Sequence, residues 1–247
     1  MSLYETEKLL AEYLLFHYGR AEEILPYSGG PRDALEYPAR CVSECVGGLP
    51  EGARALDLGC AVGRASFELA RRCGEVIGID YSRSFIAAAE RLRDTGAHEY
   101  SRADEGARTT RLVARVPPEI ERARVKFEHG DAQALRAGLG VFDVALMANL
   151  IDRLGEPARC LAQLAGLVKG GGVLVITSPY TWLEEFTPRA HWLCGEAGET
   201  LAGLRRELGA DFELVRTKDL PFLIREHARK FQWSVAQASI WRRIGSR

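Results

Sequence analysis

The chain has 247 residues, of which 47% are hydrophobic and 27% charged, with a formal net charge of −1. This is the composition of a folded domain with a core, and the balanced charge gives no general attraction to nucleic acid or anionic lipid. No apolar run approaches the roughly 20 residues of a membrane helix, and the first residues do not resemble a signal peptide. The six cysteines are scattered. We therefore expect reduced thiols, a cytoplasmic location, no metal site, and neither a nucleic-acid nor a membrane partner.

Residues 1–50 precede the first strong strand and are predicted to form a helical cap. An amphipathic helix comes first, and Ser2 with Glu5 fits a capping box at its start. A second helix is predicted over residues 33–46. We expect this segment to cover a cleft as a lid, joined to a domain formed by residues 51–247.

Strands and helices then alternate along the chain. Strands are predicted at residues 53–58, 75–79, 125–127, 142–147 and 173–177, and helices at 64–72, 84–93 and 157–168, the last ended by Gly170 to Gly172. Such alternation is typical of a parallel sheet with helices on both faces.

Two further features complete the predicted fold. Residues 212–215 and 236–241 indicate an antiparallel strand pair closing one edge of the sheet. Residues 96–124 form an arginine-rich insertion with mixed charge, interpreted as a solvated excursion. The fold class is therefore α/β and Rossmann-like, with a mostly parallel seven-stranded sheet and an antiparallel C-terminal pair.

The strongest motif follows the first predicted strand. Asp57 ends an apolar run and leads into a glycine-rich turn, in which Gly59, Cys60, Ala61 and Gly63 are candidate cofactor-binding residues. Glycines allow close approach of the backbone to a ligand at the carboxyl end of a parallel strand. The glycine spacing differs from that of dinucleotide sites. It resembles the first motif of class I methyltransferases, whose ligand carries an ammonium and a sulfonium, and an acidic residue suits that charge.

Two more acidic residues follow later strands at suitable spacing. Asp80 can accept both hydroxyls of a ribose, and Tyr81 follows it. The alternative for Asp80 is a helix N-cap, for which Ser82 competes. Asp131, with Ala132 beside it, can accept from the amine of adenine, although Gly-Asp-Ala alone is also a simple turn.

The segment after the fourth strand supplies further cleft candidates. Asn149, Asp152 and Arg153 are polar residues at a strand end, where such folds bring together the methyl donor and the acceptor. The alternative for Asn149 is a plain helix cap.

Several longer stretches resemble one particular family. They include Phe16-His17-Tyr18-Gly19, the segments 57–64, 148–154 and 228–232, and the block from Thr177 to Pro188. Together they are similar to the 4-mercaptohistidine (5-thiohistidine) N-methyltransferases of ovothiol biosynthesis, over nearly the whole chain. The resemblance implies methyl transfer from S-adenosylmethionine to the imidazole ring, giving ovothiol A and S-adenosylhomocysteine. It also implies a link to a separate iron-dependent sulfoxide synthase, since the five histidines form no convincing metal site.

Acceptor binding is predicted in three segments. The candidates are Tyr4, His17 and Tyr18 in the cap, Asn149 and Arg153 after the fourth strand, and Tyr180, Trp182, Glu184 and Arg189 after the fifth. An arginine can bind the acceptor's carboxylate, a glutamate its ammonium, and aromatic rings can stack on the imidazole. The catalytic candidates are His17 as a base, Asn149, Tyr180 and Glu184. The alternatives are core packing for the aromatic residues and a solvated helix face for Glu184.

Other functions remain open from the sequence alone. The acceptor could be another small amine, imidazole or thiol. A non-catalytic subunit with an S-adenosylmethionine fold is a third possibility, against which the intact acidic and glycine motifs argue. A nicotinamide dehydrogenase is disfavoured by the glycine spacing.

Overall fold

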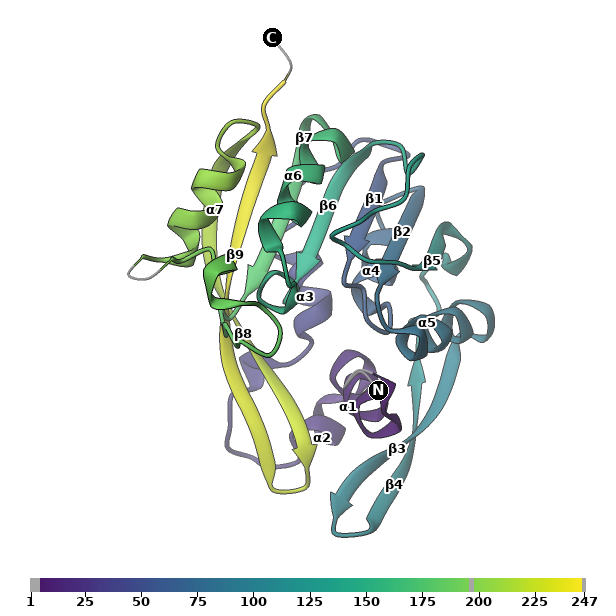
Figure 1. The fold of residues 1–247 in the computed structure, drawn as a ribbon. Coiled ribbons are helices and arrows are strands. Elements are labelled where there is room, and N and C mark those ends of the chain that lie inside the picture. Colours follow the sequence, from purple (N-terminus) through teal and green to yellow (C-terminus); the bar gives the residue numbers. More distant parts are fainter. Residues whose placement is uncertain (1–4, 196–197, 246–247) are drawn as a thin grey trace.

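A seven-stranded sheet organises the chain, whose computed structural model describes residues 5–195 and 198–245 (Figure 1). The strand order is β5-β2-β1-β6-β7-β9-β8. The strands are β1 (Arg54–Leu58), β2 (Glu75–Asp80), β5 (Val125–His129), β6 (Phe142–Ala148), β7 (Val168–Ser178), β8 (Phe212–His227) and β9 (Lys230–Arg243). All neighbours are parallel except β7 with β9 and β8 with β9. The predicted fold class, including the antiparallel C-terminal pair, is confirmed.

The sheet divides the core into two layers because successive residues of a strand point to opposite faces. On one face the core includes Leu14, Cys41, Phe67 and Phe85. They come from α1 (Glu7–Tyr18), α3 (Tyr37–Ser43), α4 (Arg64–Ala70) and α5 (Arg83–Thr95). On the other face lie α6 (Pro157–Leu167) and α7 (Thr200–Leu208). Helices therefore cover both faces, and α7 is an addition to the predicted elements.

Two local predictions about element ends are wrong. Thr6 is the N-cap of α1 and accepts from the backbone amide of Leu9, whereas Glu5 accepts from the amides of Arg83 and Ser84 at the start of α5. Glu5 thus caps a different helix from the one predicted. The glycines from residue 170 to 172 do not end α6, because that helix already ends at Leu167 and they lie within β7.

The arginine-rich insertion forms a β-hairpin that contributes to the core, not a solvated excursion. Strands β3 (Ala97–Glu105) and β4 (Arg108–Arg115) pair in a second, antiparallel sheet. Ala114 and Val116 are buried between exposed arginines, and Ile120 is buried beyond them. Alternation along β4 explains the composition there, since Arg111 and Arg115 occupy outward positions on either side of the buried Ala114.

The N-terminal segment lies between this hairpin and the one formed by β8 and β9 (Figure 1). A cluster of charged residues around Asp104, called the clasp below, joins the N-terminal segment to the two hairpins. Arg102 donates to the Asp104 carboxylate at 2.9 Å, and Arg225 lies 3.6 Å from the same oxygen. Both arginines also donate to the backbone carbonyl of Glu23, in the short helix α2 (Ala21–Ile24). Over the described ranges, no helix is long and apolar enough to cross a membrane.

The clasp predicts a specific loss of stability. Asp104→Asn leaves two largely buried guanidinium groups without their shared carboxylate and should lower the free energy of unfolding by about 2 kcal/mol. The measurement is chemical denaturation. The matched control is Glu105→Gln, since that carboxylate pairs with Arg108 in solvent and should contribute less than about 0.5 kcal/mol. Equal losses in the two variants would contradict the clasp.

Candidate functional site

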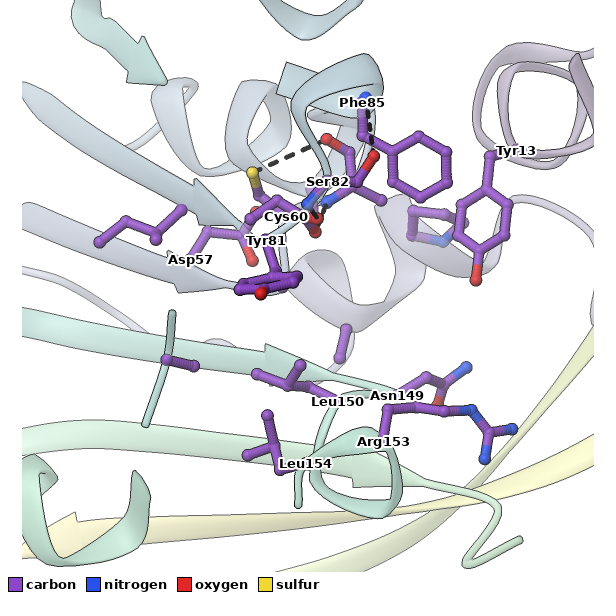
Figure 2. Close-up of a pocket in the computed structure, with 18 of the residues that line it drawn as sticks. Tyr13, Asp57, Cys60, Tyr81, Ser82, Phe85, Asn149, Leu150, Arg153 and Leu154 are labelled. Carbon is purple, nitrogen blue, oxygen red and sulfur yellow. Dashed lines mark hydrogen bonds between the residues drawn. The ribbon is translucent and has the colours of Figure 1, made fainter. Parts of the chain in front are cut away.

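A cavity of about 400 Å³ lies at the carboxyl ends of β1, β2, β5 and β6 (Figure 2). The chain leaves β1 for β2 on one side, while β6 lies on the other, and open α/β sheets bind ligands at such a reversal of strand order. Its walls come from the residues that follow these strands, from the N-terminal helices and from one residue of β8. The lining residues used below are Tyr13, Phe16, His17, Tyr37, Asp57, Gly59, Cys60, Ala61, Asp80, Tyr81, Phe85, Asp131, Ala132, Asn149, Arg153, Phe186 and Ile224.

The turn after β1 forms the floor of the cavity. The amides of Gly59 and Cys60 donate to the Ile79 carbonyl at 2.8 and 3.1 Å, and the Ala61 amide donates to the Asp80 carboxylate at 2.8 Å. Gly59 and Ala61 have positive φ of 72° and 47°. A Cβ atom at Gly59 would lie 3.0 Å from the Leu150 side chain, which also lines the cavity. The turn is thus held open by hydrogen bonds to the neighbouring strand end.

Asp57 presents a buried carboxylate beside this turn. The residue is 1% exposed, and one oxygen accepts a 2.6 Å hydrogen bond from the Ser66 hydroxyl. Burial, together with the nearby charge of Asp80, raises the pKa of Asp57 to about 7. A cationic ligand would stabilise the ionised form of the Asp57 carboxyl group in this buried position.

Asp80 and Asp131 lie on the same rim. Each oxygen of Asp80 accepts one backbone amide at 2.8 Å, from Ala61 and from Ser82, and burial raises its pKa. Ser82 is itself the N-cap of α5, so Asp80 does not serve that helix as its cap. Asp131 accepts from the backbone and side-chain amides of Gln133. The exposed Tyr81 ring also lines the cavity (Figure 2).

Aromatic side chains form a further part of the cavity lining, called the aromatic wall below. Tyr13 and Phe16 come from α1, Tyr37 from α3 and Phe85 from α5, and Ile224 of β8 joins them. The Tyr13 and Phe85 rings lie 4.7 Å apart, and those of Phe16 and Tyr37 lie 6.0 Å apart. These five residues were not among the sequence candidates. The spacing in α1 predicts a helix but does not tell which of its aromatic residues face a ligand.

His17 belongs to the same wall. Its Nδ1 atom is buried and lacks a hydrogen-bond partner in the described structure. Burial and the nearby Arg64 lower the pKa of His17 to about 3. The ring is therefore neutral near pH 7, so it is a weak proton acceptor for the base role assigned to it from the sequence.

Asn149 and Arg153 border the cavity from the other side, opposite Tyr13 (Figure 2). Asn149 has a φ of 52°, and its backbone amide donates to the Thr177 carbonyl at 2.8 Å. Arg153 lies with its guanidinium 4.8 Å from the centre of the Phe186 ring. It also donates to the backbone carbonyl of Thr181 at 3.0 Å.

Two predicted contacts lie behind the cavity wall. The side chain of Tyr18 is buried, and its hydroxyl donates to the Val62 carbonyl at 2.8 Å, so it supports the glycine-rich turn from outside. Gly63 is the N-cap of α4 with φ 85°, and a Cβ there would lie 2.5 Å from the Phe127 ring. Gly63 is therefore required for packing, and neither residue lines the cavity.

The block after β7 is also placed differently from the prediction. Tyr180 donates from its hydroxyl to the side chain of Gln237, and the indole of Trp182 donates to Thr200 at the start of α7. Glu184 and Arg189 are exposed, and none of these four lines the cavity. Phe186 is the lining residue that this block contributes. The loop packs on α7, which had not been predicted. Tyr4 lies outside the described residues.

The comparisons with known proteins agree with this geometry. A family model described as a methyltransferase domain matches residues 56–174. The ubiquinone biosynthesis O-methyltransferase of Alkalilimnicola ehrlichii is 29% identical over 137 residues, which are 56% of this chain and 45% of that protein. The magnesium-protoporphyrin O-methyltransferase of Rhodobacter capsulatus is 28% identical over 149 residues, 57% of this chain and 54% of that protein. The chain thus spans about half the length of these curated relatives.

Solved structures share the fold. A SAM-dependent methyltransferase of Methanosarcina mazei matches with a TM-score of 0.54 and 19% identity over 81% of this chain and 96% of that one. Residues 56–174, which match the methyltransferase-domain model, lie within the part of the chain that shares this fold. The [4+2]-cyclase SpnF matches this chain with a TM-score of 0.59 and 18% identity, over 96% of this chain and 93% of its own. At these identities the two structures show the fold alone.

The cofactor expected from the sequence motifs is S-adenosylmethionine, and the matched Methanosarcina mazei structure is named a SAM-dependent methyltransferase. The cavity residues fit this molecule, because Asp57, Asp80 and Asp131 surround one end of the cavity and the cofactor carries a sulfonium and an ammonium. Asp80 would hold the ribose hydroxyls, and the open turn at Gly59 leaves room for the chain between ribose and amino acid. In the described ranges, no group of three or more His, Cys, Asp or Glu side chains is placed to hold a metal ion.

The pKa of Asp57 predicts a pH effect on cofactor binding. Protonation removes a negative charge near the cationic ligand, so affinity should fall by up to about tenfold per unit as pH drops below 7. Asp57→Asn should weaken binding at pH 8 by about tenfold or more and abolish this pH dependence. Calorimetric titration with S-adenosylmethionine from pH 6 to 8 measures both.

Stability of the cofactor-free protein separates this effect from misfolding. A pKa raised in the folded state means that Asp57 favours folding when protonated and loses that contribution as pH rises through about 7. Asp57→Asn should therefore gain stability relative to wild type between pH 5 and 8. Two results would contradict the role of Asp57 in cofactor binding. One is a loss of stability of Asp57→Asn relative to wild type as pH rises, and the other is an unchanged affinity for S-adenosylmethionine in this variant.

Proposed function

We propose that this protein transfers a methyl group from S-adenosylmethionine to the imidazole ring of 4-mercaptohistidine, giving ovothiol A and S-adenosylhomocysteine. The observation that supports the proposal is the division of the cavity into two unlike halves. One half carries Asp57, Asp80 and Asp131, which suit the cationic cofactor. The other is an aromatic wall that includes Tyr13, Phe16 and Tyr37, against which a planar ring can stack. The sequence resemblance indicates which ring this is.

The chemistry needs alignment more than acid or base catalysis. The bound cofactor supplies a methyl group on a positively charged sulfur, which is a good leaving group. The aromatic wall holds the acceptor ring in line with that methyl and excludes water. His17 stays neutral, so it places no second positive charge beside the sulfonium. In this proposal His17 orients the acceptor through hydrogen bonding and does not remove its proton.

Arg153 is the proposed partner of the acceptor's carboxylate. Its guanidinium lies on the Asn149 side of the cavity and is held by Phe186 and by the Thr181 carbonyl (Figure 2). A guanidinium fixed in this way can bind a carboxylate with two parallel hydrogen bonds. This contact would favour an amino acid over a simple imidazole.

An oxygen acceptor is the second candidate. Both curated relatives described above are named O-methyltransferases. The family model begins at residue 56, however, so α1 and α3, which supply most of the aromatic wall, lie outside it. The cyclase with the same fold also indicates that the fold does not decide the reaction. We therefore base the acceptor on the cavity and on the sequence resemblance.

The direct test is incubation of the protein with S-adenosylmethionine and 4-mercaptohistidine, followed by mass analysis and location of the new methyl group. We expect a singly methylated product carrying the methyl on a ring nitrogen. Histidine and a catechol serve as comparison acceptors for the other nitrogen and oxygen classes. A faster reaction with either, or a methyl found on sulfur, would overturn the proposed acceptor. Cofactor binding without turnover of any acceptor would favour the non-catalytic alternative.

The neutral state of His17 gives a second prediction. With saturating cofactor, His17→Ala should lower kcat/KM for 4-mercaptohistidine by about tenfold, the usual range for one lost hydrogen bond to substrate. The shape of the pH profile between pH 6 and 9 should not change, since the ring does not titrate there. If kcat/KM of the wild-type protein fell below about pH 6.5 and that of His17→Ala did not, His17 would be a titrating base and the prediction would be wrong.

A further inference from the structure

A chain of hydrogen bonds joins Tyr37 of the aromatic wall to Asn149 and Thr177. The Tyr37 hydroxyl lies 2.7 Å from the Asn149 Oδ1 atom and 2.7 Å from the Thr177 hydroxyl. Tyr37 is 2% exposed and Thr177 is fully buried, so water does not compete for these groups. An amide oxygen can only accept, so the single phenol proton goes to Asn149 and the Thr177 hydroxyl donates to Tyr37. Burial raises the pKa of Tyr37, which keeps that proton in place.

This chain fixes the side-chain amide of Asn149. Its oxygen is bound to Tyr37, and its backbone is held in the left-handed region with the amide bonded to the Thr177 carbonyl. The side-chain nitrogen has no partner in the part of the chain that the structure describes, and Asn149 lines the cavity. The two N–H groups of the Asn149 side-chain amide can therefore donate to a ligand in the cavity.

Donors in this position suit an electron-rich ligand atom. The cofactor half of the cavity is already lined by Asp57, Asp80 and Asp131, which attract positive charge. The positive end of an amide dipole would repel a sulfonium or ammonium but attract a thiolate or an oxyanion. The amide lies opposite Tyr13, at the end where an acceptor ring would stack (Figure 2).

We propose that Tyr37 is a positioning residue that directs the Asn149 amide nitrogen into the cavity, so that the site selects an acceptor ring bearing an anionic sulfur or oxygen. The inference rests on the proposed function, in that the cavity must admit a methyl acceptor. It adds the basis of selection: the ring is recognised by its charged sulfur or oxygen substituent.

The test is binding of two small probes, 4-mercaptoimidazole and imidazole, to the protein saturated with S-adenosylhomocysteine. Calorimetry at pH 8 should show the thiolate-bearing ring binding about tenfold or more tightly, as expected for a hydrogen bond to a charged group. Tyr37→Phe should reduce this preference to less than about threefold. Its affinity for S-adenosylhomocysteine should stay as in wild type. The ring keeps its contacts with Phe16 and Phe222, so the fold should be retained.

The matched control is Thr177→Val. It removes a buried hydroxyl from the same chain but leaves the bond from Tyr37 to Asn149, so the preference for 4-mercaptoimidazole should persist. An equal loss in both variants would indicate a general packing effect and overturn the inference. So would tighter binding of imidazole, because an amide turned the other way would offer its oxygen to a ring N–H.

Two further results separate this inference from the proposed function. Preferential binding of 4-mercaptoimidazole without methylation of 4-mercaptohistidine would contradict the proposed reaction and support the selection by Asn149. Methylation of 4-mercaptohistidine, together with an undiminished preference for 4-mercaptoimidazole in Tyr37→Phe, would support the proposed reaction and contradict the role of Tyr37. If neither probe bound the saturated protein, the role of Tyr37 would be refuted.

Discussion

The site depends on the hydrogen bonds that join the turn after β1 to the end of β2. The amides of Gly59 and Cys60 bind the Ile79 carbonyl, and the Ala61 amide binds the Asp80 carboxylate. These bonds open the turn over the strand ends and hold Asp80 at the rim beside it. They also compensate for the strained positive φ at Ala61, whereas Gly59 adopts a positive φ readily, and they place Asp80 in a cavity lining that also contains Asp57 and Asp131.

Segments that lie far apart in the sequence form the aromatic wall of the cavity. The N-terminal helices bring aromatic rings to the cavity, and β8 adds Ile224. Two attachments hold this segment: Glu5 on the start of α5, and the clasp of Asp104 with Arg102 and Arg225 behind α2. The clasp residues do not line the cavity, so the shape of its aromatic part is set partly by side chains outside the lining. The family model does not include α1 and α3.

The sequence predicted the parallel strands well because most of them are short apolar runs with a clear end, whereas β8 and β9 extend far beyond the predicted residues 212–215 and 236–241. The acidic residues at those ends could be placed for the same reason, since parallel strands finish at one edge and bring Asp57, Asp80 and Asp131 together. Side chains on loops and helices were harder, because a motif does not reveal its orientation. The block around Trp182 turns away onto α7, and the role of Tyr37 depends on a contact with residue 149 far along the chain.

We propose that one cavity at these strand ends holds the cofactor, with Asp80 at its ribose. The most direct test of this proposal is a calorimetric titration of the intact protein with S-adenosylhomocysteine, repeated with Asp80→Ala. We expect one saturable site per chain. We also expect Asp80→Ala to bind S-adenosylhomocysteine at least about tenfold more weakly, because the ribose loses its carboxylate partner. No saturable binding to the wild-type protein, or equal binding by the variant, would contradict it.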